Sequence, residues 1–366
     1  MKKLLTLLVF GFVTLVSFAQ EQNPLKELET IRNGWAKKTI TGVKSGNILP
    51  LLTAFNKVWP TEPGKAILTD GTNPEAQDNE YHFEVDTPNG YVSADELGDF
   101  GQDLAACVWK RSNGHRLFAV RFTQSVGVFP HSIVLFYDYD AAKETLTPES
   151  QALSAFQPGF NEASVDAVSI NLPKIGKDVT VQEYIMGWYF SIKHTYKWNG
   201  MEPQWSFTTI ENYDKMEKMY NDTYQFENKI QFEKFALYDF DEDDNPELWL
   251  STNNNEYQAI FSIKENEIQM VASTYYKTNF IFHENNVIGS AGGCGTGCFR
   301  ADYTKLSESK PVYSFADQQD YDYQKEDMVS TYYKDGKKVT NAEGERILKS
   351  FGEVHDIEPL FQRMRP

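Results

Sequence analysis

One short acidic segment, from Asp239 to Glu247, carries the side chains best suited to chemistry. Carboxylates stand at its first, third, fifth and ninth positions and an asparagine at its seventh (Asp239, Asp241, Asp243, Glu247 and Asn245). Ca²⁺ collects about six to eight oxygen ligands, often from one loop of this kind. The spacing therefore predicts a structural Ca²⁺ bound by the four carboxylates and the carbonyl of Asn245, in a loop that joins two adjacent antiparallel strands.

A metal-free acidic turn is the alternative for this segment. Calcium loops place glycine at the sixth position, where the chain turns sharply, and here that position is Asp244. Aspartate adopts the left-handed backbone less readily than glycine. A related stretch, Asp138-Tyr-Asp140, also follows a strand-like run but continues with two alanines. Such a turn can therefore form without a metal ion, and both interpretations stay open.

Two of the three cysteines are close together in the sequence. Cys294 and Cys298 are separated by Gly-Thr-Gly, whose flexibility lets the two Cβ atoms approach, so a local disulfide is predicted. A redox pair would favour two intervening residues and a helix start. A zinc site would need two more ligands, and His283 is the one nearby candidate. Cys107 lies in an apolar, strand-like run and is expected to be a buried free thiol.

Local catalytic motifs are missing from the chain. It contains no G-x-S-x-G, P-loop, G-x-G-x-x-G or H-E-x-x-H pattern, and its six histidines are scattered. The glycine-rich stretch 289–297 has backbone amides that could face an anion, but its composition favours a flexible hairpin loop closed by the disulfide. Acids are plentiful, so paired carboxylates from separate strands remain an alternative source of glycosidase chemistry.

The first residues have the pattern of a secretory signal peptide. Lys2 and Lys3 precede an apolar run over residues 4–18, and Ser17-Phe-Ala19 is a small-x-small cleavage site. Cleavage after Ala19 would leave a secreted or periplasmic protein. No later segment has the 18 or so apolar residues of a membrane span.

Charge narrows the range of partners. The formal charge is −17, and removal of residues 1–19 takes away two lysines and no acid, leaving −19. Such a surface repels nucleic acid. A nucleic-acid partner is therefore not expected, and an unknown protein or glycan is.

The elements that must position these residues are mostly strands. Apolar residues at helical spacing predict helices over 25–37, 48–59 and 212–225. A last helix capped by Thr340 is also predicted, and 60–79 is predicted to be loop. Hairpins and strands fill 81–197 and 231–304. We expect a mainly β fold with a few helices, organised as two tandem antiparallel β-meander units, each preceded by a helix, over residues 20–207 and 208–366. A single β-propeller-like domain is the alternative.

Aromatic residues gather near the middle of the chain, at Trp188, Tyr189, Trp198 and Trp205. Exposed, they would stack on sugar rings or a protein partner. Buried, they would form the core of an aromatic-rich β protein, which is the interpretation favoured by the general dominance of large aromatics in cores.

Residues 232–351 resemble a family of uncharacterised secreted and lipoprotein domains of gut bacteria. The resemblance is carried by Ala236-Leu-Tyr-Asp-Phe-Asp-Glu-Asp-Asp-Asn-Pro-Glu-Leu248, similar to A-L-Y-D-I-D-G-D-G-x-P-E-L, and by Tyr332-Tyr-Lys-Asp-Gly-Lys337. The resemblance implies an exported β-rich module and Ca²⁺, and it implies no activity. The chain departs from the family's pattern where glycines are replaced by Glu242 and Asp244.

Two hypotheses for the function follow. The first is a secreted, non-enzymatic module that binds a protein or a glycan, with Ca²⁺ as a structural ion. The second is a secreted, glycan-directed hydrolase whose carboxylates come from separate strands. The missing catalytic motifs favour the first hypothesis.

Overall fold

The chain divides into two compact units. The computed structural model describes residues 25–73, 80–97, 101–126, 129–149, 167–185, 190–264, 267–275 and 277–365. The N-terminal unit comprises Met1–Gln157, Ala167–Val181 and Tyr196–Trp205, and the C-terminal unit comprises Pro158–Asp166, Gln182–Thr195 and Ser206–Pro366. The predicted signal peptide lies outside the described residues, and so do Trp188 and Tyr189.

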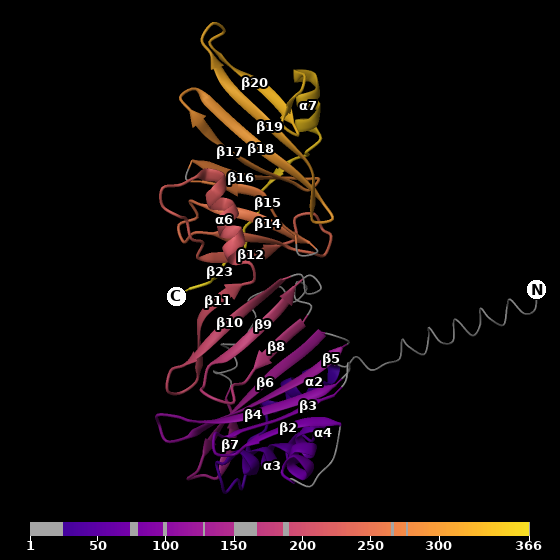
Figure 1. Ribbon diagram of the computed structural model, residues 1–366, viewed down its shortest axis with the longest axis vertical. Helices are drawn as coiled ribbons and strands as arrows, with labels where there is room; N and C mark the ends of the chain where they lie inside the picture. Colours follow the sequence, from indigo (N-terminus) through magenta and orange to yellow (C-terminus); the bar gives the residue numbers. More distant parts are fainter. Residues whose placement is uncertain are drawn as a thin grey trace, which may run out of the picture. The chain divides into compact units, whose positions relative to one another are not determined.

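Strands dominate both units, and the prediction of a mainly β chain with a few helices is confirmed (Figure 1). The described strands form three sheets, of 11, 5 and 7 strands, and none of them closes into a barrel. Neighbouring strands of the two smaller sheets pair antiparallel, and the largest sheet contains one parallel contact, His131 to Val168. Open sheets of such different sizes are not the repeated four-stranded blades of a propeller.

The largest sheet has the order β11-β10-β9-β8-β6-β5-β4-β3-β2, with β7 and β1 attached beside β6. The division into units falls within β9, β10 and β11. The strands are β1 (Ile40–Thr41), β2 (Tyr81–Asp86), β3 (Tyr91–Glu96), β4 (Gln102–Lys110), β5 (Arg116–Val126), β6 (Phe129–Asp140), β7 (Thr145–Pro148), β8 (Ala167–Asn171), β9 (Val179–Ile185), β10 (Phe190–Trp198) and β11 (Pro203–Ile210).

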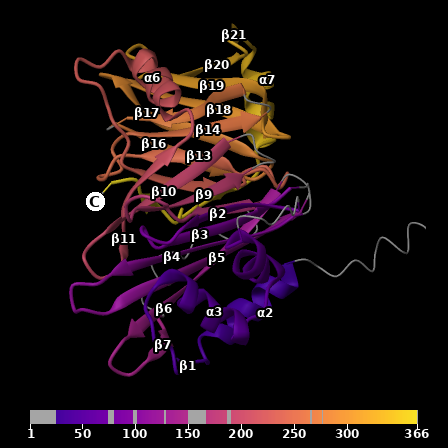
Figure 2. The same cartoon turned by 60° about the horizontal axis from the view of Figure 1, so that its bottom comes forward.

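Helices α2 (Leu25–Trp35) and α3 (Ile48–Val58) lie against the sheet of the N-terminal unit (Figure 2). The apolar residues of α3 recur so that Leu51, Leu52 and Phe55 are fully buried. The Phe55 ring makes edge contacts with Phe118 on β5 and Tyr137 on β6. Both helices begin at the predicted residues and end within two residues of the predicted ends.

Two predictions for the N-terminal unit need correction. Residues 60–79 were expected to be loop, but they contain α4 (Glu62–Ala66) and a π-helical turn, η1 (Ile67–Gly71). The Thr61 hydroxyl caps α4 by accepting a hydrogen bond from the Gly64 amide, so a proline-rich stretch still starts a helix. Strand β11 was also not predicted, because polar and apolar residues do not alternate clearly along it.

Two sheets and two helices make up most of the C-terminal unit. The five-stranded sheet has the order β15-β14-β13-β12-β23. Its apolar face packs on α6 (Tyr213–Tyr224), whose Met216 and Tyr220 are buried. Its strands are β12 (Lys234–Tyr238), β13 (Glu247–Ser251), β14 (Gln258–Lys264), β15 (Glu267–Thr274) and β23 (Gln362–Arg363).

The seven-stranded sheet has the order β21-β20-β19-β18-β17-β16-β22, and α7 (Asn341–Lys349) packs on it (Figure 1). Thr340 caps α7 as predicted, accepting from the Glu343 amide. The strands are β16 (Thr278–His283), β17 (Val287–Gly295), β18 (Cys298–Ser307), β19 (Lys310–Asp322), β20 (Asp327–Lys334), β21 (Lys337–Lys338) and β22 (Val354–His355).

Much of this sheet was not predicted. Strand β17 covers the glycine-rich stretch that was expected to be a flexible loop, and β19 and β20 fill a region to which no element was assigned. Glycine fits β17 because its neighbours come close. A Cβ at Gly289 would lie 2.6 Å from the Tyr303 ring.

Candidate functional site in the acidic loop

The acidic segment is the connection between β12 and β13. These strands pair antiparallel, with Tyr238 opposite Glu247, so the predicted position of the loop between adjacent antiparallel strands is confirmed. Apolar residues on both strands bury the hairpin, among them Phe235 and Leu248. The loop therefore starts and ends on a rigid sheet.

The loop closes without the glycines that were thought necessary. Glu242 and Asp244 take up the left-handed backbone, with φ values of 55° and 69°. The two carboxylate oxygens of Asp239 accept hydrogen bonds from the amides of Asp243 (3.2 Å) and Asp244 (2.9 Å). These bonds hold the turn in a conformation that non-glycine residues seldom adopt.

Three of the five predicted ligands converge. Asp239, Asp241 and Glu247 each offer one carboxylate oxygen, and these oxygens lie within 4.8 Å of one another. The other two predicted ligands are directed elsewhere. The Asp243 carboxylate and the Asn245 carbonyl both accept from the Ser309 hydroxyl, at 2.9 and 3.4 Å.

Ser309 is a residue of this site that the sequence analysis missed. It lies in the two-residue turn between β18 and β19, where Glu308 and Ser309 both have positive φ, 51° and 55°. Asn-Gly usually fills such turns, so this one is strained and is held by its contacts. The Ser309 amide donates to Asp241 (2.9 Å). No local motif marks a serine 68 residues away from its partner.

Two buried carboxylate oxygens in this cluster have no hydrogen-bond partner among the described residues. They are Oδ1 of Asp241 and Oε1 of Glu247, whose residues are 8% and 1% exposed. The second oxygen of Glu247 accepts from the Phe240 amide (3.1 Å). Burial raises the pKa of Glu247 to about 8 and also raises the pKa of Asp241, and the neighbouring carboxylates add to both shifts. Unpaired buried carboxylates are costly. A positive charge at this cluster would offset that cost.

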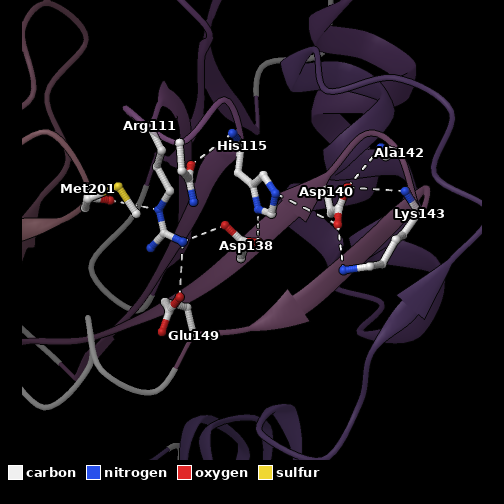
Figure 3. A network of polar contacts seen from close by, with 9 residues as sticks. Arg111, His115, Asp138, Asp140, Ala142, Lys143, Glu149 and Met201 are labelled. Carbon is white, nitrogen blue, oxygen red and sulfur yellow. Dashed lines mark hydrogen bonds and ion pairs between the residues drawn. The ribbon is translucent and has the colours of Figure 1, made fainter.

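The N-terminal unit contains a comparable pair of aspartates that does have positive partners (Figure 3). Asp138 and Asp140 end β6, and the guanidinium of Arg111 lies 2.5 Å from the Asp138 carboxylate. His115 contacts the other Asp138 oxygen at 2.6 Å, and Lys143 contacts Asp140 at 2.9 Å. The hydrogen bond from Lys143 lowers the pKa of Asp140.

The two clusters therefore differ in how their charge is balanced. In the described part of the chain, no lysine, arginine or histidine forms an ion pair with Asp239, Asp241, Asp243 or Glu247. Lys264 acts on Asp241 only as the weakest of several influences. The arrangement of oxygen donors is thus suited to an external cation, whereas the N-terminal arrangement is complete with its own side chains.

The predicted disulfide is present, between Cys294 on β17 and Cys298 on β18, and Cys107 is free and buried. His283 bonds a backbone carbonyl rather than this pair. Trp198 and Trp205 are partly buried against an apolar cluster of the N-terminal unit, which agrees with the core interpretation. None of the helices in the described ranges has the length and apolar character of a membrane span.

A scan against protein-family models finds no match for this chain, and a search of curated proteins finds none either. The class of the molecule therefore follows from the fold and the acidic loop alone. It is a two-unit, mainly β protein with a cluster of three carboxylates that could hold a metal ion.

Proposed function

We propose that the protein is an exported, non-enzymatic binding module whose C-terminal unit is stabilised by Ca²⁺ at Asp239, Asp241 and Glu247. One observation carries the ion proposal: two buried carboxylate oxygens of this cluster lack a partner in the described structure. A cation between the three carboxylates would satisfy these oxygens and offset their mutual repulsion.

The donor set favours Ca²⁺ over other common ions. All three converging donors are carboxylate oxygens. Zinc usually takes histidine or cysteine ligands, and neither residue belongs to the cluster. Mg²⁺ demands a tight octahedron and releases water reluctantly, whereas Ca²⁺ accepts irregular arrangements of oxygens.

The proposal of export rests on the signal-like first residues and on the disulfide, which suits an oxidising compartment. The proposal of binding rests on the β-rich fold, the acidic loop and the missing catalytic motifs. The hydrolase hypothesis is supported less well. That hypothesis draws its carboxylates from separate strands. The acidic cluster gives it no support, because a glycosidase needs two carboxylates that face the substrate, and Asp241 and Glu247 are almost completely buried.

Thermal unfolding of the full chain tests the ion. We expect millimolar Ca²⁺ to raise the midpoint relative to EDTA, since an ion that binds only the folded state adds about 2.7 kcal/mol at a hundredfold excess over Kd. Mg²⁺ should substitute poorly. Asp241→Ala should abolish the response.

Asp140→Ala is the matched control, because Asp140 is the second aspartate of the pair Asp138–Asp140, as Asp241 is of Asp239–Asp241, and it has its own cation in Lys143. It should lower the midpoint equally in Ca²⁺ and EDTA and leave the difference between them unchanged. An identical wild-type midpoint in both conditions, with no calorimetric binding of Ca²⁺, would refute the proposed ion. A full Ca²⁺ response in Asp241→Ala would place the ion elsewhere.

A further inference from the structure

A polar hollow of about 630 Å³ adjoins the acidic loop within the C-terminal unit. Its lining includes Tyr238, Asp239, Glu242, Glu284, Lys305 and His355. The β16–β17 turn forms another part of the wall and is tied to the loop, because the side-chain amide of Asn286 donates to the Asp241 carbonyl (3.2 Å). The following inference rests on the proposed ion.

The ion would have one buried side and one side facing the hollow. Asp241 and Glu247 are 8% and 1% exposed and do not line the hollow, whereas Asp239 is half-buried and does line it. An ion held by all three carboxylates is thus enclosed by Asp241 and Glu247 and borders the hollow at Asp239. Coordination positions that the protein leaves free would point to the hollow.

Counting the protein oxygens shows that several coordination positions on the Ca²⁺ would be free. One oxygen of each of the three carboxylates converges on the site. One oxygen each of Asp241 and Glu247, and both oxygens of Asp239, accept backbone amides. Asp243 and Asn245 are bonded to Ser309. Because Ca²⁺ takes about six to eight oxygens, about three to five positions would remain for water or a ligand.

The charge of the site selects the kind of ligand. The three carboxylates exceed the charge of a divalent ion by one, and the lining adds Glu242 and Glu284 against Lys305. An anionic ligand would meet a negative surface. Neutral oxygen donors meet no such repulsion, and a pair of adjacent hydroxyls on a sugar ring supplies two of them.

We infer that the hollow binds a neutral glycan, and that two adjacent sugar hydroxyls replace water on the Ca²⁺. Tyr238 is 36% exposed at the wall, and its ring is held by the Phe240 ring, with 4.7 Å between centroids. The apolar face of a sugar packs on such an aromatic ring. The ion would therefore position the hydroxyls, and Tyr238 would position the ring.

The first test counts the water molecules on the ion. Eu³⁺ replaces Ca²⁺ in the full chain, and its luminescence lifetimes in H₂O and D₂O give the number of coordinated waters. We expect about three or more. One water or none on bound Eu³⁺ would mean a closed structural site and would overturn the inference, while leaving the proposed ion in place.

The second test measures sugar binding by saturation-transfer NMR with methyl mannoside, methyl galactoside and methyl fucoside. At least one sugar should bind in Ca²⁺ and be lost in EDTA. Tyr238→Ala should keep the Ca²⁺ affinity and weaken sugar binding about fivefold, whereas Tyr323→Ala, at a tyrosine 79% exposed outside the hollow, should change neither.

The outcomes separate the two proposals. Calorimetric Ca²⁺ binding without binding of any of the three sugars would overturn the glycan inference alone. Sugar binding that persists in EDTA would overturn it as well, since the hydroxyls would not be on the ion. Failure of Ca²⁺ itself to bind would refute the proposed function, and the inference with it.

Discussion

Glu247→Gln tests whether the buried carboxylate lowers the free energy of unfolding when no cation is bound. Glu247 is 1% exposed, and burial raises its pKa to about 8. Without an ion, the folded protein therefore keeps this side chain protonated at neutral pH. Glutamine retains the shape and the acceptor for the Phe240 amide but carries no charge to be suppressed.

The direction of the effect follows from proton uptake. The pKa is about 8 in the folded chain and 4.5 for an ordinary glutamate, so between these values the folded state binds more protons than the unfolded state. The contribution of Glu247 to the stability of the ion-free protein is therefore fully present below its ordinary pKa and is lost as pH rises toward 8. The loss from Glu247 is about 5 kcal/mol overall, of which roughly half falls between pH 5 and pH 7.

Chemical unfolding of the full chain in EDTA, at pH 5 to 8, measures this loss. We expect Glu247→Gln to lose much less stability with pH and to exceed the wild type by about 2–3 kcal/mol at pH 7. The burial that raises the pKa of Asp241 acts in the same direction in both proteins, so part of the slope remains. With excess Ca²⁺ the wild type should gain stability as pH rises, because ion binding releases the proton, while Glu247→Gln gains little. Equal pH slopes for the two proteins in EDTA would refute this reasoning.

Three further predictions concern other parts of the fold. Thiol titration should find no reactive thiol in the native protein and one after denaturation, since Cys294 and Cys298 are bonded and Cys107 is buried; three would exclude the disulfide. Arg111→Met should lower the free energy of unfolding by roughly 2–3 kcal/mol. This is less than for a fully buried pair, because the Asp138 and Glu149 side chains are 20% and 23% exposed. The loss should be the same in Ca²⁺ and EDTA. Thr340→Ala should cost about 1 kcal/mol by removing the cap of α7, with Thr340→Ser restoring most of it in urea unfolding.

Local sequence signals were sufficient for elements whose cause is local. Helix α3 follows from apolar residues at helical spacing, and α7 follows from the spacing of Thr340 and Glu343. The β12–β13 hairpin follows from two apolar runs that flank one acidic loop. The disulfide follows from two cysteines separated by a short flexible stretch. In each case neighbours in sequence make the decisive contacts.

Signals failed where a strand has polar residues or glycine and is defined by its partners. Strand β19 includes Asp317, Gln318 and Gln319, and nothing in that composition predicts a strand. Its hydrogen-bonded neighbours, β18 and β20, make it one. Strand β17 owes its glycines to the close approach of Tyr303, which is visible only after folding.

The sequence by itself determined which carboxylates stand together in the acidic loop, because their spacing is a local property. Tertiary structure decided which of them converge. The hydroxyl of Ser309, which lies 68 residues from Asp241, donates hydrogen bonds to Asp243 and Asn245. The converging carboxylates are therefore Asp239, Asp241 and Glu247. It also decided the charge balance, since Arg111 reaches Asp138 across 27 residues while no comparable cation in the described chain pairs with the acidic loop. The physical reason is that burial and charge compensation depend on distant segments brought together by the sheets.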